Sequence, residues 1–181
     1  MRLIVYGTNI DLRPVEIEDA EFILSLRLDP ELNQYLSPVE DNLEKQIEWI
    51  KNYRLYSRDY YFIIQNKMQE PIGTIRVYDI QDVVFCWGSW IVIPQARKYA
   101  SFESAFLLYR FAFGGLGLDK TNFDIRKDNK RVLNFHQKFG ATIFDETEAD
   151  YLMTYTKNTF LEKQNEYQNV IKKSVSYYFN N

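Results

Sequence analysis

The sequence predicts a single mixed α/β domain in which helices cover a central sheet. Runs of β-branched and aromatic residues alternate along the chain with segments whose apolar residues recur at helical spacing. The longest such run, residues 83–93, precedes a segment, residues 102–113, that is apolar nearly all round and therefore belongs between a sheet and other elements. The 181 residues are 46% hydrophobic, enough for one well-buried core, and no repeat or linker divides them.

The composition disfavours several classes of protein. A net charge of −3 argues against a non-specific nucleic-acid binder, which needs a basic surface. The single cysteine, Cys86, excludes an internal disulfide and a cysteine-rich metal site, and it fits a reducing compartment. The apolar run near the N-terminus is too short for a signal sequence, and no later segment approaches a membrane span. We therefore expect a cytoplasmic protein that binds no nucleic acid, membrane or metal ion.

The first 60 residues predict a short hairpin or a bent edge strand, followed by two helices. Gly7 and Thr8 form a turn between two short apolar segments, and Pro14 ends the second of them. Acidic residues in the first turn support the first helix, which breaks at Asp29-Pro30. In order, we expect strands at residues 2–6 and 9–13, a helix at 16–28, a further turn at 31–36 and an amphipathic helix at 43–53.

The central part of the chain predicts three strands and the apolar helix. Gly88 lies inside the longest strand, where a glycine often marks a bulge or the close approach of a ligand, and Pro94 ends that strand. Ser101 is the expected N-cap of the helix, and Gly114-Gly115 are expected to end it in left-handed conformations. We expect strands at residues 60–65, 72–80 and 83–93, a polar turn at 66–70 and a helix at 102–113.

The turn between the longest strand and the apolar helix predicts an anion site. Free N–H groups at the start of the helix and the positive end of the helix dipole both face this turn. Arg97 and Lys98 lie in it and add two positive charges. This combination suits a ligand that carries phosphates.

The last third of the chain predicts a strand, a helix, a hairpin and one further helix. Apolar and aromatic residues recur from Val132 to Phe139 at i, i+3, i+4 and i+7, with Asp128 as the expected cap and Gly140 just past the end. We expect strands at 121–126, 142–144 and 151–156, helices at 130–139 and 157–179, a domain at 1–156 and a C-terminal helical extension at 157–181.

Three segments resemble the GNAT N-acetyltransferase superfamily, in the branch that includes ribosomal-protein N-terminal acetyltransferases. They read IDLRPVEIEDAEFILSLRLDPELNQYL, PIGTIRVYDI and RFAFGGLGLDKTNFDIRKDNKRVLNFHQKFGA, and the similarity covers roughly residues 8 to 156. The predicted order of strands and helices is also that of this superfamily. The resemblance implies a central mixed sheet of six to seven strands, with strands four and five splayed, flanked by four helices plus a C-terminal helix.

The resemblance also implies that acetyl-CoA binds as a co-substrate between the splayed strands. Backbone groups of Ile91, Val92 and Ile93 would pair with the pantetheine, and the turn that follows would wrap the pyrophosphate. The family turn reads Gln/Arg-x-x-Gly-x-Gly/Ala, whereas Lys98 stands here in place of the first glycine. Asn129 either bonds the pantetheine or caps its own helix. The candidate pyrophosphate residues are Arg97, Lys98, Tyr99, Ala100 and Ser101.

His136 stands where the family often has the tyrosine that acts as general acid toward the leaving thiolate, so it is the candidate catalytic residue; the alternative is a packed core histidine. Candidate acceptor-binding residues are Tyr35, Trp87 and Ser89. The alternatives are an ordinary surface aromatic for Tyr35 and, for Trp87 and Ser89, a strand buried on both sides. Strand alternation places Trp87 and Ser89 on one face and Trp90 on the other. Glu103, in the first turn of its expected helix, is interpreted as a complement to the helix dipole rather than as a base.

We therefore hypothesise an N-acetyltransferase that moves the acetyl group of acetyl-CoA to a primary amine of a small metabolite or amino sugar, by direct attack in a ternary complex. One alternative is a catalytically degenerate GNAT-fold binding or assembly module, which the missing turn glycine would support. Others are an N-terminal or protein acetyltransferase, and a transferase that uses a longer acyl-CoA. The protein is expected to be a monomer or a homodimer.

Overall fold

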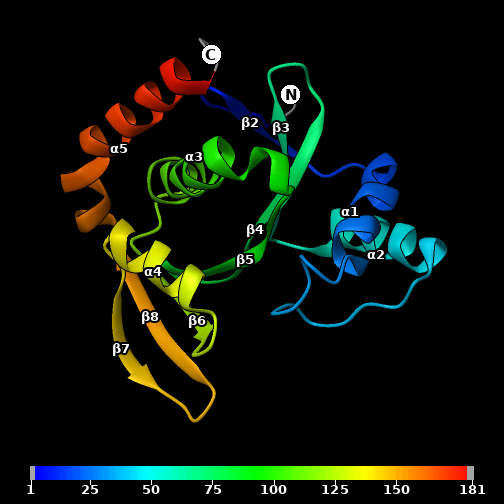
Figure 1. The fold of residues 1–181 in the computed structure, drawn as a ribbon. Helices are drawn as coiled ribbons and strands as arrows, with labels where there is room; N and C mark the ends of the chain where they lie inside the picture. Colours follow the sequence, from blue (N-terminus) through cyan, green and yellow to red (C-terminus); the bar gives the residue numbers. More distant parts are fainter. Residues whose placement is uncertain (1–2, 179–181) are drawn as a thin grey trace.

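The computed structural model describes residues 3–178, which form one eight-stranded sheet with five helices (Figure 1). The predicted mixed α/β class is confirmed, but the sheet has eight strands instead of the expected six to seven. The strands are β1 (Val5–Tyr6), β2 (Ile10–Pro14), β3 (Tyr60–Asn66), β4 (Pro71–Gln81), β5 (Val84–Val92), β6 (Lys120–Arg126), β7 (Thr142–Glu146) and β8 (Asp150–Thr156). The helices are α1 (Ala20–Leu28), α2 (Leu43–Tyr56), α3 (Arg97–Tyr109), α4 (Lys130–Phe139) and α5 (Lys157–Tyr178).

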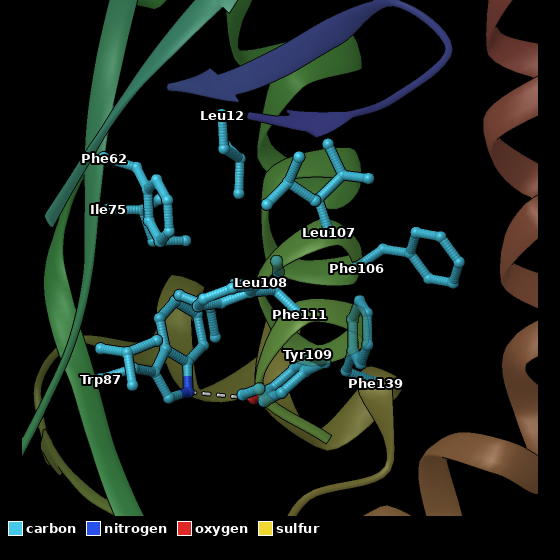
Figure 2. Packing of buried hydrophobic residues seen from close by; sticks show 14 of the residues in the cluster. Leu12, Phe62, Ile75, Trp87, Phe106, Leu107, Leu108, Tyr109, Phe111 and Phe139 are labelled. Atoms are coloured by element: carbon cyan, nitrogen blue, oxygen red, sulfur yellow. Dashed lines mark hydrogen bonds between the residues drawn. The ribbon is translucent and has the colours of Figure 1, made fainter. Parts of the chain in front are cut away.

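The sheet separates two layers of helices. The strand order is β1-β2-β3-β4-β5-β6-β8-β7, and Figure 1 shows α1 and α2 grouped on one side and α3, α4 and α5 on the other. Successive side chains of a strand point to opposite faces, so β3 contributes to both layers. Tyr61 and Ile63 belong to the small core with α1 and α2, and Phe62 and Ile64 belong to the large core around α3. Figure 2 shows this large core, with Phe62 and Ile75 facing Leu108 and Phe111.

Strands β5 and β6 separate soon after they meet. They are the parallel pair of the sheet, and they pair only at Val84 with Lys120 and at Phe85 with Thr121. All the other neighbouring strands are antiparallel. The predicted splaying of the fourth and fifth family strands is therefore confirmed, and it leaves the C-terminal half of β5 without a partner on one edge.

A bulge in β5 changes which face its side chains occupy. Between the pairs Arg76–Gly88 and Thr74–Ile91, β4 advances by two residues and β5 by three. Ser89 takes up the difference with a φ of +47°, and its carbonyl accepts a 2.7 Å hydrogen bond from the Thr74 hydroxyl.

Because of the extra residue, Trp87 and Trp90 lie on the same side of the sheet, with ring centroids 5.5 Å apart. Simple alternation, which placed Trp90 on the opposite face from Trp87, was wrong. The bulge signalled by Gly88 is confirmed at the next residue.

Helix α3 starts earlier than predicted. Pro94 opens a 3₁₀ turn, Pro94–Ala96, which runs directly into α3 at Arg97, because the fixed φ of proline favours the first helical position. Ser101 therefore lies inside the helix, and its prediction as the N-cap was wrong. The other end differs too, since a π-helical turn, Arg110–Gly115, follows α3 and the left-handed glycine is Gly117, with φ +73°, instead of Gly114 or Gly115.

Glu103 is buried beneath the β1–β2 turn instead of complementing a helix end in solvent. Its carboxylate accepts hydrogen bonds from the Thr8 N–H, from the Asn9 N–H at 3.1 Å and from the Asn9 side-chain amide at 2.7 Å. A Cβ on Gly7 would lie 2.5 Å from this carboxylate, so the turn requires glycine there. The interpretation of Glu103 as a dipole complement was therefore wrong, because its partners come from a segment about a hundred residues earlier.

Helix α4 agrees with its sequence pattern except at the cap. The Asn129 side chain accepts the Val132 N–H at 3.3 Å, so Asn129 is the N-cap and the prediction of Asp128 was wrong. Gly140 ends the helix with a φ of +101°, as predicted.

Helix α5 packs onto α3 (Figure 1), and three of its side chains, Phe160, Tyr167 and Ile171, are buried in the large core. The Tyr167 hydroxyl also donates a hydrogen bond to the carbonyl of Phe139. The start at Lys157 agrees with the sequence, whereas Phe179, the predicted end, lies outside the described residues. Division into a domain and an extension stays a prediction. No helix among residues 3–178 is both long and apolar enough to cross a membrane.

Candidate active site

A cavity of about 1020 Å³ lies where β5 and β6 separate. Its walls come from β5, the start of α3, β6, α4 and the loop between α1 and α2. Nine residues proposed from the sequence line it: Tyr35, Trp87, Ser89, Ile91, Val92, Arg97, Ser101, Asn129 and His136. Four others, Ile93, Lys98, Tyr99 and Ala100, are not part of the lining, and Ala100 is fully buried in the large core.

The unpaired edge of β5 presents backbone groups to the cavity. The Ile93 N–H donates to the Ile72 carbonyl at 3.0 Å, so it faces β4. Because backbone groups alternate along a strand, the N–H and carbonyl of Val92 point the other way, toward the gap. Arg97 Nε donates to this Val92 carbonyl at 3.2 Å, which fixes the arginine beside the strand edge. Val92 is thus placed to pair with an extended ligand, and Ile93 is not.

One wall of the cavity is aromatic. Trp87, Trp90, Phe123 and Phe135 surround the imidazole of His136, with ring centroids 4.6 Å from it for Phe123 and 5.2 Å for Trp87. The indole N–H of Trp87 donates to the Tyr109 hydroxyl on α3 at 3.1 Å, as Figure 2 shows, and the indole N–H of Trp90 donates to Ser104 at 3.0 Å. Both indoles are therefore locked against α3.

His136 is neutral in this wall. It is 4% exposed, and burial lowers its pKa to about 3. Its Nδ1 has no hydrogen-bond partner among residues 3–178. A buried polar atom without a partner needs an explanation, and a ligand in the adjoining cavity supplies one. The neutral ring can donate one hydrogen bond and accept another.

The remainder of the lining is rich in charge, which the sequence reasoning missed apart from Arg97. Within the described part of the chain, the lining holds five cationic side chains, Arg27, Arg97, Arg126, Lys130 and Arg131, and three acidic ones, Glu31, Asp124 and Asp128. The cavity is therefore net positive although the whole chain carries −3. No sequence motif marked these residues, because they come together only when α1, β6 and α4 fold around the gap.

Arg27 also fixes the loop that covers the cavity. One of its terminal nitrogens donates to the Ser37 carbonyl at 2.6 Å, and its own carbonyl accepts from the Asn33 side chain at 2.9 Å. Its Nε is buried and has no partner within residues 3–178. The loop carries Tyr35 to the cavity wall. This arrangement holds the loop and places the Arg27 side chain in the cavity lining, where its positive charge favours an anionic ligand.

Comparisons with known proteins agree with this geometry. Residues 9–142 match the sequence profile of the acetyltransferase (GNAT) domain. The structure is similar to that of apo FdhC, described as a nucleotide-linked sugar GNAT, with a TM-score of 0.83 and 38% identity over 92% of this chain and 97% of that chain. A search of curated protein sequences gave no match.

More distant likenesses show the fold alone. A mutant of spermidine N-acetyltransferase SpeG from Vibrio cholerae gives a TM-score of 0.74 with 14% identity, over 87% of this chain and 99% of that chain. A GCN5-related N-acetyltransferase from Brucella melitensis gives 0.76 with 16% identity, over 93% and 85%. These matches do not single out the ribosomal-protein branch, which stays a prediction.

Proposed function

The chain belongs to the GNAT family of acetyltransferases and is therefore an acyltransferase, and from this premise we propose that it acetylates a primary amine on a nucleotide-linked sugar. The observation that carries the proposal is the net-positive, aromatic-walled cavity between the separated strands β5 and β6. Such a cavity suits two anionic substrates that meet at the gap, acetyl-CoA and a sugar nucleotide.

The donor half of the cavity is assigned to acetyl-CoA. The family uses acetyl-CoA as its acetyl donor. The outward N–H of Val92 suits an amide of the pantetheine arm, and Arg97, held against the same strand edge, suits a phosphate. Lys98 stands in place of a glycine in the first turn of α3. Its Cβ keeps the backbone N–H groups further from a phosphate, and its positive charge compensates for part of that lost contact.

His136 is assigned to the leaving group. Burial keeps the imidazole neutral in the free enzyme, so it meets the substrate as a hydrogen-bond donor and acceptor. A thiolate forming beside it would raise the pKa of the ring. The neutral imidazole can therefore take a proton that the attacking nitrogen loses and pass it to the sulfur, which is the general-acid role expected from the sequence.

The acceptor half is assigned to a nucleotide-linked amino sugar. The 38% identity extends over nearly the whole of this chain and of FdhC. The cationic lining, which includes Arg27, suits a diphosphate, and Tyr35 supplies a flat apolar face for a sugar ring or base. Trp87, which is 5% exposed, packs within the aromatic wall and supports the cavity from behind. A polyamine such as spermidine is a poorer fit, because its charge has the same sign as the lining.

Two measurements test the proposal. Acetyl-CoA at 100 times its Kd should stabilise the protein by about 2.7 kcal/mol in thermal denaturation. Thiol release should then be followed with UDP- and dTDP-linked sugars that carry a primary amine, with spermidine as the comparison acceptor. We expect release with at least one amino sugar nucleotide. Absence of stabilisation at millimolar acetyl-CoA would favour the degenerate binding module, and release with spermidine alone would overturn the acceptor assignment.

A further inference from the structure

Asp124 lies directly across the gap from the bulge in β5. The last residues that β5 and β6 pair are Phe85 and Thr121. Three residues further along each strand stand Gly88 and Asp124, and both line the cavity. The strands diverge beyond Phe85 and Thr121, so the Asp124 carboxylate and the Gly88–Ser89 backbone lie on opposite sides of the gap between β5 and β6.

The side chain of Asp124 belongs to the face of the sheet away from the aromatic wall. Its neighbour Phe123 packs against Trp87 and His136, so alternation directs Asp124 to the opposite face. Tyr78 lies on that face, since the guanidinium of Arg76 spans Trp49 of α2 and the Tyr78 ring. A Cβ on Gly88 would lie 3.3 Å from the Tyr78 hydroxyl, so glycine there leaves this side of the opening clear.

The other acids on this face have partners. Asp59 pairs with Arg76, Asp150 pairs with Arg126, and Asp79 accepts a hydrogen bond from Gln81. The Asp124 side chain is exposed, and no hydrogen bond or ion pair joins its carboxylate to another residue in the range 3–178. Glu31 and Asp128 of the lining share this property, but of the three only Asp124 lies on β6, across the gap from Gly88. Burial raises the pKa of Tyr78, and the charges of Cys86 and Asp124 add to that shift, which agrees with a carboxylate close by.

We infer that Asp124 binds the ammonium group of the acceptor and takes the proton that this group must lose before it attacks the acetyl carbon. The inference rests on the proposed function and assigns one residue to its acceptor half. A carboxylate without an internal partner, at the rim of a net-positive cavity, favours a cation at that one point. The sugar nucleotide would then be held by cations at its phosphates and by this anion at its amine.

The ammonium nitrogen gives one proton to the Asp124 carboxylate, which passes it to solvent, and the free amine attacks the thioester carbonyl. The new C–N bond forms, the C–S bond breaks, and the sulfur leaves with the electron pair. The nitrogen loses its second proton as the amide forms, and one proton ends on the sulfur. The products are the acetamide, CoA thiol and one released proton.

The test uses the full-length enzyme, acetyl-CoA and the best amino sugar nucleotide from the panel. Asp124→Asn should lower kcat/KM for the acceptor at least about 100-fold at pH 7, while acetyl-CoA stabilises the variant as it does the wild type. Asp124→Glu should restore part of the activity. Asp145→Asn, an exposed aspartate on β7 outside the cavity, is the matched control and should leave activity unchanged.

The pH profile separates a proton acceptor from a structural role. Below the pKa of the acceptor amine, each pH unit supplies about ten times more free amine, so the deficit of Asp124→Asn should shrink as the pH rises. The ionisable groups on this face are Arg76, Tyr78 and Asp79 on β4, Cys86 on β5, Arg126 on β6 and Asp150 on β8, and Arg27 and Glu31 line the cavity. These groups are present in both the wild type and Asp124→Asn, so their own titration cancels in the ratio of the two kcat/KM values.

The outcomes distinguish this inference from the proposed function. If the wild type acetylates no amine, the proposed function fails. If the wild type is active and Asp124→Asn keeps more than a tenth of its kcat/KM, the inference is overturned. It is also overturned if the deficit of Asp124→Asn is independent of pH, or if Asp128→Asn, a change at another acid of the cavity lining, causes the larger loss.

Discussion

Glu103 and His136 are buried almost equally, at 1% and 4% exposure, yet their surroundings are opposite. The Glu103 carboxylate sits beneath the β1–β2 turn and accepts hydrogen bonds from two backbone N–H groups and one side-chain amide. His136 sits among four aromatic rings, and its Nδ1 has no partner among the described residues. A buried group whose hydrogen bonds are all made within the protein, such as Glu103, maintains the fold. A buried group beside a cavity that lacks a hydrogen-bond partner, such as His136, is a candidate for binding a ligand.

Burial disfavours the charged form of both groups. It raises the pKa of Glu103, although the hydrogen bonds from Asn9 and Thr8 oppose that shift, and it lowers the pKa of His136 to about 3. Burial alone therefore does not identify a functional group, whereas the presence or absence of hydrogen-bond partners does. Four experiments test this distinction.

The largest expected effect is the loss of stability in Glu103→Ala. The change would leave three donors under the β1–β2 turn without an acceptor, each worth about 1–3 kcal/mol. We expect the free energy of unfolding in urea to fall by about 3 kcal/mol or more. Glu103→Gln, which keeps one acceptor oxygen, should lose less. A loss below about 1 kcal/mol for the alanine variant would contradict the structural role.

The next effect concerns turnover in His136→Phe. Because the Nδ1 of the imidazole has no partner in the described chain, replacing His136 by an apolar ring of similar shape should not lower the free energy of unfolding. Steady-state kinetics should show kcat reduced about 100-fold with the KM for acetyl-CoA unchanged. His136→Gln, which retains polar groups, should lose less. Unchanged kcat in both variants would remove His136 from the mechanism.

The pH dependence of stability should separate the same two groups. His136 has a lower pKa folded than unfolded, so the unfolded chain binds more protons and stability falls as the pH drops below about 6.5. Between pH 7 and pH 5 this amounts to about 2 kcal/mol. Urea unfolding at both pH values should show that contribution in the wild type and not in His136→Phe.

The Glu103 contribution has the opposite sign. Its pKa is raised on folding, so the folded protein binds the extra proton, and stability from this group falls as the pH rises from its ordinary pKa toward the raised one. An identical pH dependence of stability in the wild type and His136→Phe would contradict the contribution assigned to His136.

Arg97 is an intermediate case and gives the smallest expected effect. Its Nε bonds the Val92 carbonyl, yet its side chain lines the cavity, so it serves both the fold and the ligand. Arg97→Ala should weaken acetyl-CoA binding about tenfold, a change in line with one charge-assisted hydrogen bond. Isothermal titration would measure it, with Lys67→Ala on the far β3–β4 turn as control. Equal affinities for the two variants would contradict the phosphate assignment.

Local patterns predicted the parts of the site that depend on neighbours in sequence. The i, i+3, i+4, i+7 spacing from Val132 to Phe139 places His136 on the inner face of α4, and Gly140 marks the end of that helix. The splayed strands were expected only from the resemblance to the GNAT superfamily. These signals survive because helix faces and caps are decided within a few residues.

Long-range and single-residue features were beyond the sequence. The role of Glu103 depends on Thr8 and Asn9, about 95 positions earlier, and no local pattern links them. The change of face after Ser89 depends on one extra, unpaired residue in β5, and only the register of β5 against β4 reveals it. The charged residues of the cavity lining were not predicted for the same reason, since Arg27 and Asp124 reach the cavity from elements far apart in the chain.

The extra residue at Ser89 has a consequence for how this enzyme can diverge. Point substitutions change the size or polarity of Trp87 and Trp90, but both indoles keep facing α3 and α4. Removing one residue at the bulge would restore the two-residue repeat of the strand and turn one indole out of the wall altogether. Relatives with different acceptors are therefore expected to differ here by a one-residue insertion or deletion as well as by exchange of side chains.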